Sequence, residues 1–429
     1  MKLELMHPAD QLVTIMERIY SCGMTTTSGG NLSILDDNGD IWITPAGVDK
    51  GSLTRNDMVR VSANGKITGN HRPSSEWPFH SIVYKRRPDI KAVLHAHPPA
   101  LLSFSIVRKI PHTRLIPNAD IICGDIKMAE YELPGSAELG ENIAKMFDTG
   151  SNVVMLENHG VVVGDKDIFS AFHAFETLDF CARLEINALR LGNIKPLTEK
   201  YVEISRNKNN ALLEEFEAKS YSSEEREARM KMCELVKRSY NQRLFTSTQG
   251  TFSERLSDGA FIITPYGMDR KYITPDDIVR IEDGKKERGK NPSRSVILHR
   301  EIYARHPEVN SIIIAHPPNI MAFAVSDTDF DSKIIPESYI MLRDIPKVPF
   351  GSSFLQPALF AKEISPQTPV VLVENDCVIV AGESLINAFD RLEVAEFSAN
   401  AIISARQVGE IVKISEYETE RIKTAFNLK

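Results

Sequence analysis

The chain has 429 residues, 42% hydrophobic and 25% charged, with a formal net charge of −7. These values are typical of a globular protein large enough for two domains, and the negative charge gives no reason to expect a nucleic acid or an anionic membrane as partner. The sequence shows no secretory signal pattern, no apolar run long enough to span a bilayer and no CxxC pair among its five cysteines, so we expect a cytoplasmic protein without a disulfide framework.

In the first half, apolar runs of strand length alternate with helical patterns. Helices are predicted over residues 8–21, 75–87, 137–147 and 167–190, and strands over residues 41–47, 92–97, 153–157 and 161–164. The second of these helices has Ser74 or Ser75 as its expected N-cap and ends before Pro88. The alternation predicts an α/β domain of about 200 residues.

Segments of the first half recur in the second half in the same order. Residues 43–47, 72–100 and 153–164 recur as residues 263–267, 291–319 and 370–382. For the longest pair the offset is 219 positions (291 − 72 = 219), and the other pairs lie close to it. Similarity at one fixed offset indicates a duplication.

The duplication predicts two domains of one fold, residues 1–215 and residues 220–429. The junction, residues 198–229, is polar and strongly charged, and its pattern is helical rather than rich in glycine and serine. We therefore expect a stiff connection that holds the two copies in a fixed relation.

Three histidines in the first half form a candidate metal site. His95 and His97 lie two apart in a predicted strand, so both imidazoles point to the same face, although a polar pair at a strand end is the alternative interpretation. His159 follows another predicted strand and precedes Gly160, at a turn from which it can project. Three histidines with an open fourth position are typical of catalytic zinc, and imidazole also suits other first-row metals.

Small-residue turns suggest a phosphorylated substrate. Glu76 lies near the start of a helix preceded by Ser74 and Ser75, where backbone N–H groups favour an anion; compensation of the helix dipole is the alternative role of Glu76. The turns at residues 27–31 and 44–47 also allow a phosphate to approach the backbone closely. Together with the histidines, these turns predict a phosphorylated substrate bound over a metal ion.

Six motifs in the first half, covering nearly all of residues 10–195, resemble the class II aldolase/adducin family, in particular its L-fuculose-phosphate aldolase branch. They are SGGNLS (28–33), ITPAG (43–47), PSSEWPFH (73–80), AVLHAHPP (92–99), YELPGS (131–136) and ENHGVVVG (157–164). The resemblance implies a three-layer α/β/α domain with a mixed, largely antiparallel central sheet. The second half resembles the same family more weakly.

The resemblance also implies roles for single residues. Glu76 would be the catalytic acid/base, and Zn2+ or another divalent transition metal would be bound by His95, His97 and His159. The substrate phosphate would be held by Asn31, Gly47, Ser74 and Ser75, with Ala46 where relatives often have a hydroxyl. Such an enzyme cleaves a ketose phosphate, for example L-fuculose 1-phosphate, to dihydroxyacetone phosphate and an aldehyde. The metal would stabilise the negative charge and Glu76 would move the proton.

Other activities on the same scaffold remain open. The aldolases use a tyrosine from a neighbouring subunit in the loop that corresponds to residues 112–120, and this loop has none. The 4-epimerase branch uses an aspartate there, which makes Asp120 a candidate acid/base; an Asx-turn is the alternative. A sugar-phosphate 4-epimerase, decarboxylase or dehydratase and an adducin-like non-catalytic assembly protein are therefore the alternatives to an aldolase.

The second copy lacks the predicted chemistry. The counterparts of Asn31, Ser75, Glu76, His95, His97 and His159 are Thr251, Arg294, Ser295, Ile314, His316 and Asp376. We expect one metal ion per chain and a structural role for the second copy. Family members form fourfold rings, so two tandem chains would form a homodimer with pseudo-fourfold symmetry, or a higher homo-oligomer. Tyr339 could then reach a neighbouring metal site; an ordinary half-buried tyrosine is the alternative.

Overall fold

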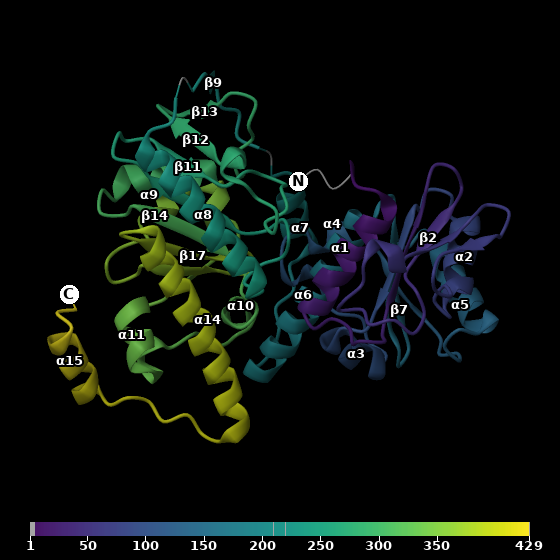
Figure 1. The fold of residues 1–429 in the computed structure, drawn as a ribbon. Helices are drawn as coiled ribbons and strands as arrows, with labels where there is room; N and C mark the ends of the chain where they lie inside the picture. Colours follow the sequence, from purple (N-terminus) through teal and green to yellow (C-terminus); the bar gives the residue numbers. More distant parts are fainter. Residues whose placement is uncertain (1–4, 209, 219, 429) are drawn as a thin grey trace. The chain divides into compact units, whose positions relative to one another are not determined.

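The computed structural model describes residues 5–208, 210–218 and 220–428. Its contacts divide the chain into two compact units, Met1–Thr113 with Asn118–Arg183, and Arg114–Pro117 with Leu184–Lys429 (Figure 1). The boundary placed at residues 215–220 from the sequence stays a prediction of where the two repeats divide. Among the described residues, no helix has both the length and the apolarity needed to cross a membrane.

The first unit contains an eight-stranded sheet in the order β4-β3-β2-β1-β5-β8-β7-β6. Only the β6–β7 pair is parallel, which confirms the expected mixed, largely antiparallel sheet. The strands are β1 Asn31–Leu35, β2 Ile41–Ile43, β3 Val59–Val61, β4 Ile67–Thr68, β5 Ala92–Ala96, β6 Ile126–Ala129, β7 Val153–Leu156 and β8 Gly160–Asp165. The strand expected over residues 41–47 is wrong beyond Ile43, because Pro45 cannot donate a ladder hydrogen bond and the chain turns there.

Helices cover both faces of this sheet. They are α1 Pro8–Ser21, α2 Trp77–Arg86, α3 Pro99–Ile106, α4 Ala119–Cys123, α5 Ala137–Asp148 and α6 Ile168–Leu191, with 3-10 turns at Arg55–Asp57 and Thr113–Leu115. One face packs Phe79 and Val83 of α2 and Phe147 of α5 against Val93 and Val162 of the sheet. Figure 1 shows α1 on the opposite side, which gives the expected three layers. The four predicted helices match α1, α2, α5 and α6 to within two residues at each end.

The start of α2 differs from the prediction. Glu76, with φ −92° and ψ 7°, occupies the N-cap position, and neither Ser74 nor Ser75 caps the helix. Trp77 N–H donates to the Ser74 carbonyl at 3.0 Å, which forms a turn before the helix begins. Pro78 lacks an N–H and is tolerated only in a first helical turn, which places the helix start at Trp77. Glu76 is therefore held at a helix entrance, where its side chain can leave the helix surface.

The second unit contains a nine-stranded sheet in the order β15-β16-β17-β14-β10-β11-β12-β13-β9. Its pairs are antiparallel except β15–β16 and β9–β13. The strands are β9 Glu215–Phe216, β10 Thr251–Arg255, β11 Phe261–Ile263, β12 Val279–Glu282, β13 Lys285–Glu287, β14 Ser311–Ala315, β15 Lys347–Val348, β16 Val370–Val373 and β17 Cys377–Gly382. Thr251 pairs with Ile314 in the same register as Asn31 pairs with His95, so the two separate sheets have the same strand pairing at this point.

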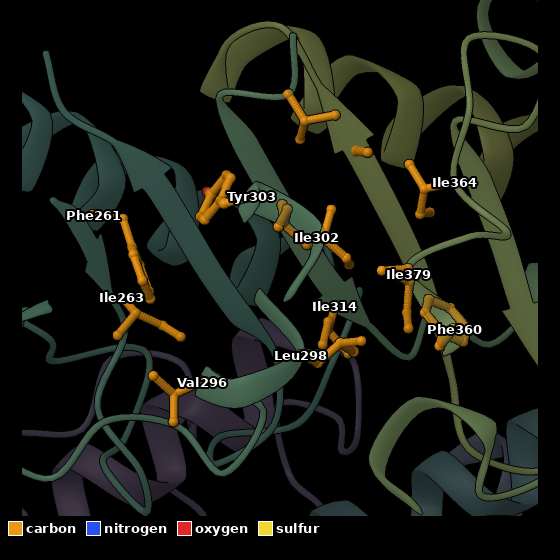
Figure 2. Packing of buried hydrophobic residues seen from close by; sticks show 14 of the residues in the cluster. Phe261, Ile263, Val296, Leu298, Ile302, Tyr303, Ile314, Phe360, Ile364 and Ile379 are labelled. Carbon is orange, nitrogen blue, oxygen red and sulfur yellow. The ribbon is translucent and has the colours of Figure 1, made fainter. Parts of the chain in front are cut away.

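The second unit also repeats the packing of the first. Its helices are α7 Glu199–Arg206, α8 Ser223–Asn241, α9 Val296–Arg305, α10 Ile320–Ala324, α11 Pro336–Leu342, α12 Ser352–Leu355, α13 Pro357–Phe360, α14 Leu385–Val408 and α15 Glu416–Ala425, with 3-10 turns at Pro275–Asp277 and Ser332–Ile334. Figure 2 shows Leu298 and Ile302 of α9 and Phe360 of α13 packed with Ile314 and Ile379 of the sheet. The helix α9 thus takes the place that α2 has in the first unit.

The junction is only partly helical. α7 ends at its C-cap Asn207 and α8 begins after its N-cap Ser222, so the helix expected through residues 198–229 is wrong between these two caps. In between, β9 pairs in parallel with β13. The polar residues after Asn207 favour loop conformations over a helix, and the short strand fixes this segment to the second sheet. Residues 209 and 219 of the expected helix lie outside the described residues.

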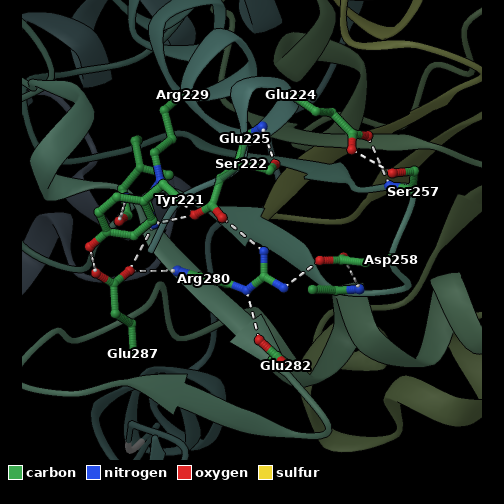
Figure 3. A network of polar contacts seen from close by, with 12 residues as sticks. Tyr221, Ser222, Glu224, Glu225, Arg229, Ser257, Asp258, Arg280, Glu282 and Glu287 are labelled. Carbon is green, nitrogen blue, oxygen red and sulfur yellow. Dashed lines mark hydrogen bonds and ion pairs between the residues drawn. The ribbon is translucent and has the colours of Figure 1, made fainter. Parts of the chain in front are cut away.

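A buried charge network joins α8 to β12 and β13 (Figure 3). Arg229 donates to Glu225 at 2.7 Å and to Glu287 at 2.8 Å. Tyr221 donates to Glu287 at 2.6 Å, and Arg280 donates to Glu225 at 2.8 Å. Glu225, Arg229 and Glu287 are almost completely buried. Since each buried charge has an opposite partner, the network fixes the position of α8 on the sheet.

Candidate metal centre

The three predicted histidine ligands lie together in the first unit. One nitrogen from each of His95, His97 and His159 lies within 4.8 Å of the others, and no other group of this kind occurs among the described residues. The Nε2 atoms of His95 and His97 are 2.9 Å apart. His95 is the second-last residue of β5, His97 directly follows this strand, and His159 lies in the turn between β7 and β8, so neighbouring strands of the sheet position the imidazoles.

Hydrogen bonding and burial fix the state of these rings. His95 Nδ1 donates to the Val161 carbonyl at 3.0 Å, which leaves the lone pair of the neutral ring on Nε2. Burial lowers the pKa of His95 and of His97 to about 3, so both imidazoles are neutral at about pH 7. Burial also lowers the pKa of His159. Neutral imidazoles whose lone pairs face one another are suited to a shared cation.

Glu76 lies against this group. Its Oε2 is 3.3 Å from His95 Nε2 and its Oε1 is 3.6 Å from His159 Nε2. Glu76 Oε1 and His159 Nδ1 are buried and have no hydrogen-bond partner in the part of the chain that the structure describes. Buried polar atoms are rarely left unpaired, and Glu76 Oε1 lies beside the histidine group, 3.6 Å from His159 Nε2, so this oxygen indicates a missing partner. Three imidazoles and a carboxylate around these atoms fit a divalent cation.

The backbone around His159 explains why a glycine follows it. Gly160 has φ +148°, and a Cβ there would lie 2.6 Å from the Ala96 carbonyl oxygen and 2.8 Å from His97 Cδ2. Only glycine therefore allows β8 to approach β5 at the metal site. The Ser105 hydroxyl accepts a hydrogen bond from the His159 N–H at 3.1 Å and donates to the Leu156 carbonyl. These contacts hold the turn that carries His159.

The structure brings together the turns expected to bind phosphate. Ala46 N–H donates to the Arg72 carbonyl at 3.0 Å and Ser74 N–H donates to the Thr44 carbonyl at 3.1 Å. Gly47, with φ +69°, is exposed, and so is Ser75. Ser74 is buried and its hydroxyl accepts from the Glu76 N–H at 3.3 Å. The two turns thus lie side by side next to Glu76; binding of phosphate by these residues stays a prediction.

Lys50 is a residue that the sequence analysis did not single out. It is 3% exposed, and its Nζ donates to the Pro45 carbonyl at 2.6 Å. Its N–H donates to the Thr27 carbonyl at 2.9 Å. Burial lowers the pKa of its ammonium group. Lys50 joins two of the predicted phosphate turns, and its only signal in the sequence is a cation three residues after Gly47.

Asn31 is engaged in a different contact from the one expected. Its Nδ2 donates to Glu76 Oε2 at 2.7 Å, and its Oδ1 accepts from His80 Nε2 at 2.5 Å. Contact with a phosphate through its remaining N–H stays a prediction. His80 was also not singled out, although it lies four residues after Glu76, on the same side of α2, and recurs in the second copy as His299.

Two further candidates lie elsewhere. Asp120 is in the first turn of the short helix α4, after Asn118 with φ +67°, and not in an open loop. Tyr339 in α11 is 5% exposed, with the guanidinium carbon of Arg343 5.7 Å and the ammonium of Lys333 5.9 Å from its ring centre. It is therefore more deeply buried than a half-buried surface tyrosine. The catalytic roles of both residues stay predictions.

The second unit has different side chains at the equivalent position. Thr251 and Ser293 share a hydrogen bond of 2.8 Å between their hydroxyls, and Asp376 accepts from Ser353 at 3.0 Å. Burial lowers the pKa of His316 to about 4. Ile314 offers no ligand atom, and the described residues of this unit contain no group of three potential metal ligands. A second copy without a metal ion stays a prediction.

The family model for the class II aldolase and adducin N-terminal domain matches the chain twice, over residues 10–186 and over residues 230–403. The protein therefore belongs to the class II aldolase and adducin family. Both halves match the same family, which confirms the duplication expected from the repeat.

Individual relatives have several related activities. The 5-deoxy-D-ribulose 1-phosphate aldolase of Bacillus thuringiensis serovar kurstaki is 30% identical over 198 residues, 45% of this chain and 91% of that protein. The L-fuculose phosphate aldolase of Methanococcus maripaludis is 34% identical over 175 residues, 41% of this chain and 93% of that protein. The 3-oxo-tetronate 4-phosphate decarboxylase of Pectobacterium atrosepticum is 32% identical over 178 residues, 41% of this chain and 81% of that protein. Each relative matches less than half of this chain.

Proposed function

We propose that this protein is a metal-dependent aldolase that cleaves a ketose 1-phosphate, such as L-fuculose 1-phosphate or a related sugar, to dihydroxyacetone phosphate and an aldehyde. The observation that supports this most directly is the group of His95, His97 and His159 with Glu76 against it. The names of two relatives, both aldolases acting on a sugar phosphate, agree with this substrate class. Zinc is the metal we propose, since three imidazoles with an open position are typical of catalytic zinc.

The proposed chemistry divides between the metal and Glu76. When bound, the metal supplies Lewis-acid stabilisation of negative charge on the ketose oxygens. As the bond between carbons 3 and 4 breaks, its electron pair stays on carbon 3 and carbon 4 becomes the aldehyde carbonyl. Glu76 donates a proton to carbon 3, and in the synthetic direction its carboxylate removes that proton. Asp120 and Tyr339 are the candidates for accepting the proton of the 4-hydroxyl group.

The phosphate is expected to lie in the exposed turns beside Glu76. Gly47 and Ser75 are exposed and offer backbone N–H groups and a hydroxyl that suit an anion, whereas Ser74 can contribute only its hydroxyl, because its N–H already donates to the Thr44 carbonyl. Anchoring the phosphate holds carbon 3 near Glu76, which lowers the entropic cost of the proton transfer.

Decarboxylation is the second candidate function. A relative of 32% identity is named a 3-oxo-tetronate 4-phosphate decarboxylase. Loss of carbon dioxide from a 3-oxo acid also leaves an electron pair on a carbon that must be protonated. The same metal group and Glu76 can serve either reaction, so the substrate decides between them. An epimerase and a non-catalytic assembly protein have no comparable supporting observation here.

In the deciding experiment, purified protein loaded with Zn2+ is incubated separately with two sets of substrates. Release of dihydroxyacetone phosphate from L-fuculose 1-phosphate, L-rhamnulose 1-phosphate or 5-deoxy-D-ribulose 1-phosphate supports the aldolase. Release of carbon dioxide from 3-oxo-tetronate 4-phosphate, without cleavage of the ketose phosphates, supports the decarboxylase. Absence of both reactions with a loaded metal site contradicts the proposal.

Replacement of Glu76 tests its role. Glu76→Gln preserves the shape of the side chain but removes the proton-transfer group, so we expect kcat to fall on the order of 10²–10⁴-fold. Metal content and the thermal unfolding midpoint should stay close to those of the wild type. A Glu76→Gln variant that turns over the substrate at the wild-type rate would show that Glu76 is not the acid/base.

A further inference from the structure

Five side chains of the first unit form one continuous hydrogen-bond chain that ends on Glu76. The Tyr84 hydroxyl lies 2.7 Å from Ser33 Oγ, and Ser33 Oγ lies 2.7 Å from His80 Nδ1. His80 Nε2 is 2.5 Å from Asn31 Oδ1, and Asn31 Nδ2 is 2.7 Å from Glu76 Oε2. Ser33, His80 and Asn31 are at most 3% exposed, so water does not compete for these bonds.

The chemistry of the groups gives this chain one direction. Asn31 Oδ1 only accepts, so the neutral His80 ring must carry its proton on Nε2. His80 Nδ1 then accepts from the Ser33 hydroxyl, which leaves Ser33 to accept from Tyr84. Asn31 donates its N–H to Glu76. Every donor therefore points toward the carboxylate, and the tautomer of His80 sets the orientation of the Asn31 amide.

The second unit retains one part of this chain and lacks the other. Ser253 Oγ lies 2.6 Å from His299 Nδ1 and 2.7 Å from the Tyr303 hydroxyl, as in the first unit. Thr251 stands in place of Asn31 and Ser295 in place of Glu76. His299 Nε2 is consequently buried with no hydrogen-bond partner among the described residues. The hydrogen-bonded serine, histidine and tyrosine thus occur in both units. Among the described residues, the link from this histidine to a carboxylate occurs in the first unit, beside His95, His97 and His159.

We propose that His80 is a positioning residue, which acts through Asn31 to hold the Glu76 carboxylate in the orientation that the metal site and the substrate require. The proposal rests on the proposed function, because it assigns a purpose to the position of Glu76. A carboxylate at a helix entrance has several rotamers, and one fixed N–H donor on Oε2 selects among them. Among the described residues Oε1 has no hydrogen-bond partner, so it is the oxygen left to face a cation or the substrate.

The duplication supplies a matched control for the kinetic test. His80→Gln and His299→Gln remove the same buried ring from the same Ser–His–Tyr arrangement, but only the first is linked to a carboxylate. With L-fuculose 1-phosphate as the probe, we expect His80→Gln to lower kcat on the order of 10- to 100-fold with KM nearly unchanged. His299→Gln should leave kcat unchanged. Equal kcat values for the two variants would overturn the proposal.

A double variant separates positioning from a general loss of stability. If His80 acts through Glu76, then Glu76→Gln with His80→Gln should turn over no more slowly than Glu76→Gln alone. If the fold-decreases in kcat of the two single variants multiplied in the double variant, the proposal would be overturned, since His80 would then act by a route that does not involve Glu76. If Glu76→Gln itself keeps the wild-type rate, the failure belongs to the proposed function instead.

Nuclear magnetic resonance tests the arrangement without any turnover. In protein labelled with 15N on histidine, His80 should carry its proton on Nε2, and that proton should exchange slowly with solvent. Asn31→Leu removes the acceptor and should shift this signal, while the signal of His299 stays in place. A His80 ring protonated on Nδ1 would overturn the proposal, whatever the substrate of the enzyme proves to be.

Discussion

At the residue scale, His97 is the one predicted metal ligand that has a histidine as its counterpart in the second copy. His316 is its counterpart, so one substitution can be made at the same structural place in each unit. His97→Ala should remove the bound divalent ion because two imidazoles remain, while His316→Ala should leave the ion in place. Metal analysis after gel filtration measures this, with one ion per chain expected in the wild type. Two ions per chain, or metal loss in the His316→Ala variant, would contradict the assignment.

Gly160 provides a test of the backbone at the same site. A methyl group there would meet the Ala96 carbonyl oxygen at 2.6 Å and His97 Cδ2 at 2.8 Å, so Gly160→Ala should displace His97 and weaken metal binding. Gly150 has φ +91° and nothing within 4 Å of an added Cβ, so Gly150→Ala introduces backbone strain without a clash. Zinc titration against a chelator should show weaker binding in the first variant only. Equal affinities in both variants would mean that His97 adapts to the added methyl group.

The sequence predicted the cluster of three histidines better than the residues that support it. Spacing along a strand places His95 and His97 on one face, and the structure brings His159 to them. His80, Ser33 and Lys50 were not predicted, because a buried polar residue in a helix or strand looks like a surface residue in a single sequence. Their signal is repetition: Ser33 recurs as Ser253 and His80 as His299, which becomes informative only once the two copies are compared in space.

At the element scale, turns and chain ends account for most of the differences from the prediction. Apolar periodicity located α1, α2 and α5 because each of these helices buries one face, whereas α6 was located by its length and apolar content and is buried over most of its circumference. Periodicity does not report where a turn ends, so the strand beginning at Ile41 was made too long and the start of α2 was placed too early. β9 was missed since two residues give no periodic signal; its strand conformation depends on pairing with β13.

The charge network around Glu287 should make the second unit sensitive to acid. Burial raises the pKa of Glu287, but hydrogen bonds from Lys290, Tyr221 and Arg229 outweigh it and lower the pKa from 4.5 to about 2. A lowered folded-state pKa stabilises the fold above the unfolded value and loses this contribution as the pH falls toward the folded value. We therefore expect the protection of β12 and β13 against hydrogen exchange to decrease between about pH 4.5 and pH 2.

Hydrogen exchange with mass spectrometry, corrected for the intrinsic pH dependence of exchange, measures this loss. Glu287→Gln cannot titrate and should show a smaller change in protection over the same range. It should also be less stable at neutral pH, because the Arg229 guanidinium loses a charged partner in a buried environment. An identical acid response in both proteins would show that other carboxylates control the acid sensitivity of the second unit.

At the scale of the whole molecule, the second copy keeps a complete core around a position where the described residues include no group of three potential metal ligands. Its sheet buries Ile312, Ile314 and Ile379 as completely as a catalytic domain would. Keeping such a core without the catalytic residues indicates that the copy is needed for its fold. The ring expected from the sequence would give a reason: a ring of four domains needs four folded domains, and only the copies that bind substrate would need a metal.

We therefore expect two chains to close one ring, with a mass of about 96 kDa from two chains of 48.1 kDa (2 × 48.1 = 96.2) and two metal ions. If each catalytic copy needs a neighbour, activity per chain should fall when the protein is diluted below the dissociation constant of the dimer. Light scattering coupled to gel filtration gives the mass, and turnover measured over a dilution series gives the dependence on assembly. A higher assembly with an even number of chains is compatible with this account. A 48.1 kDa monomer with full activity at every concentration would contradict it, and the second copy would then serve the stability of its own chain alone.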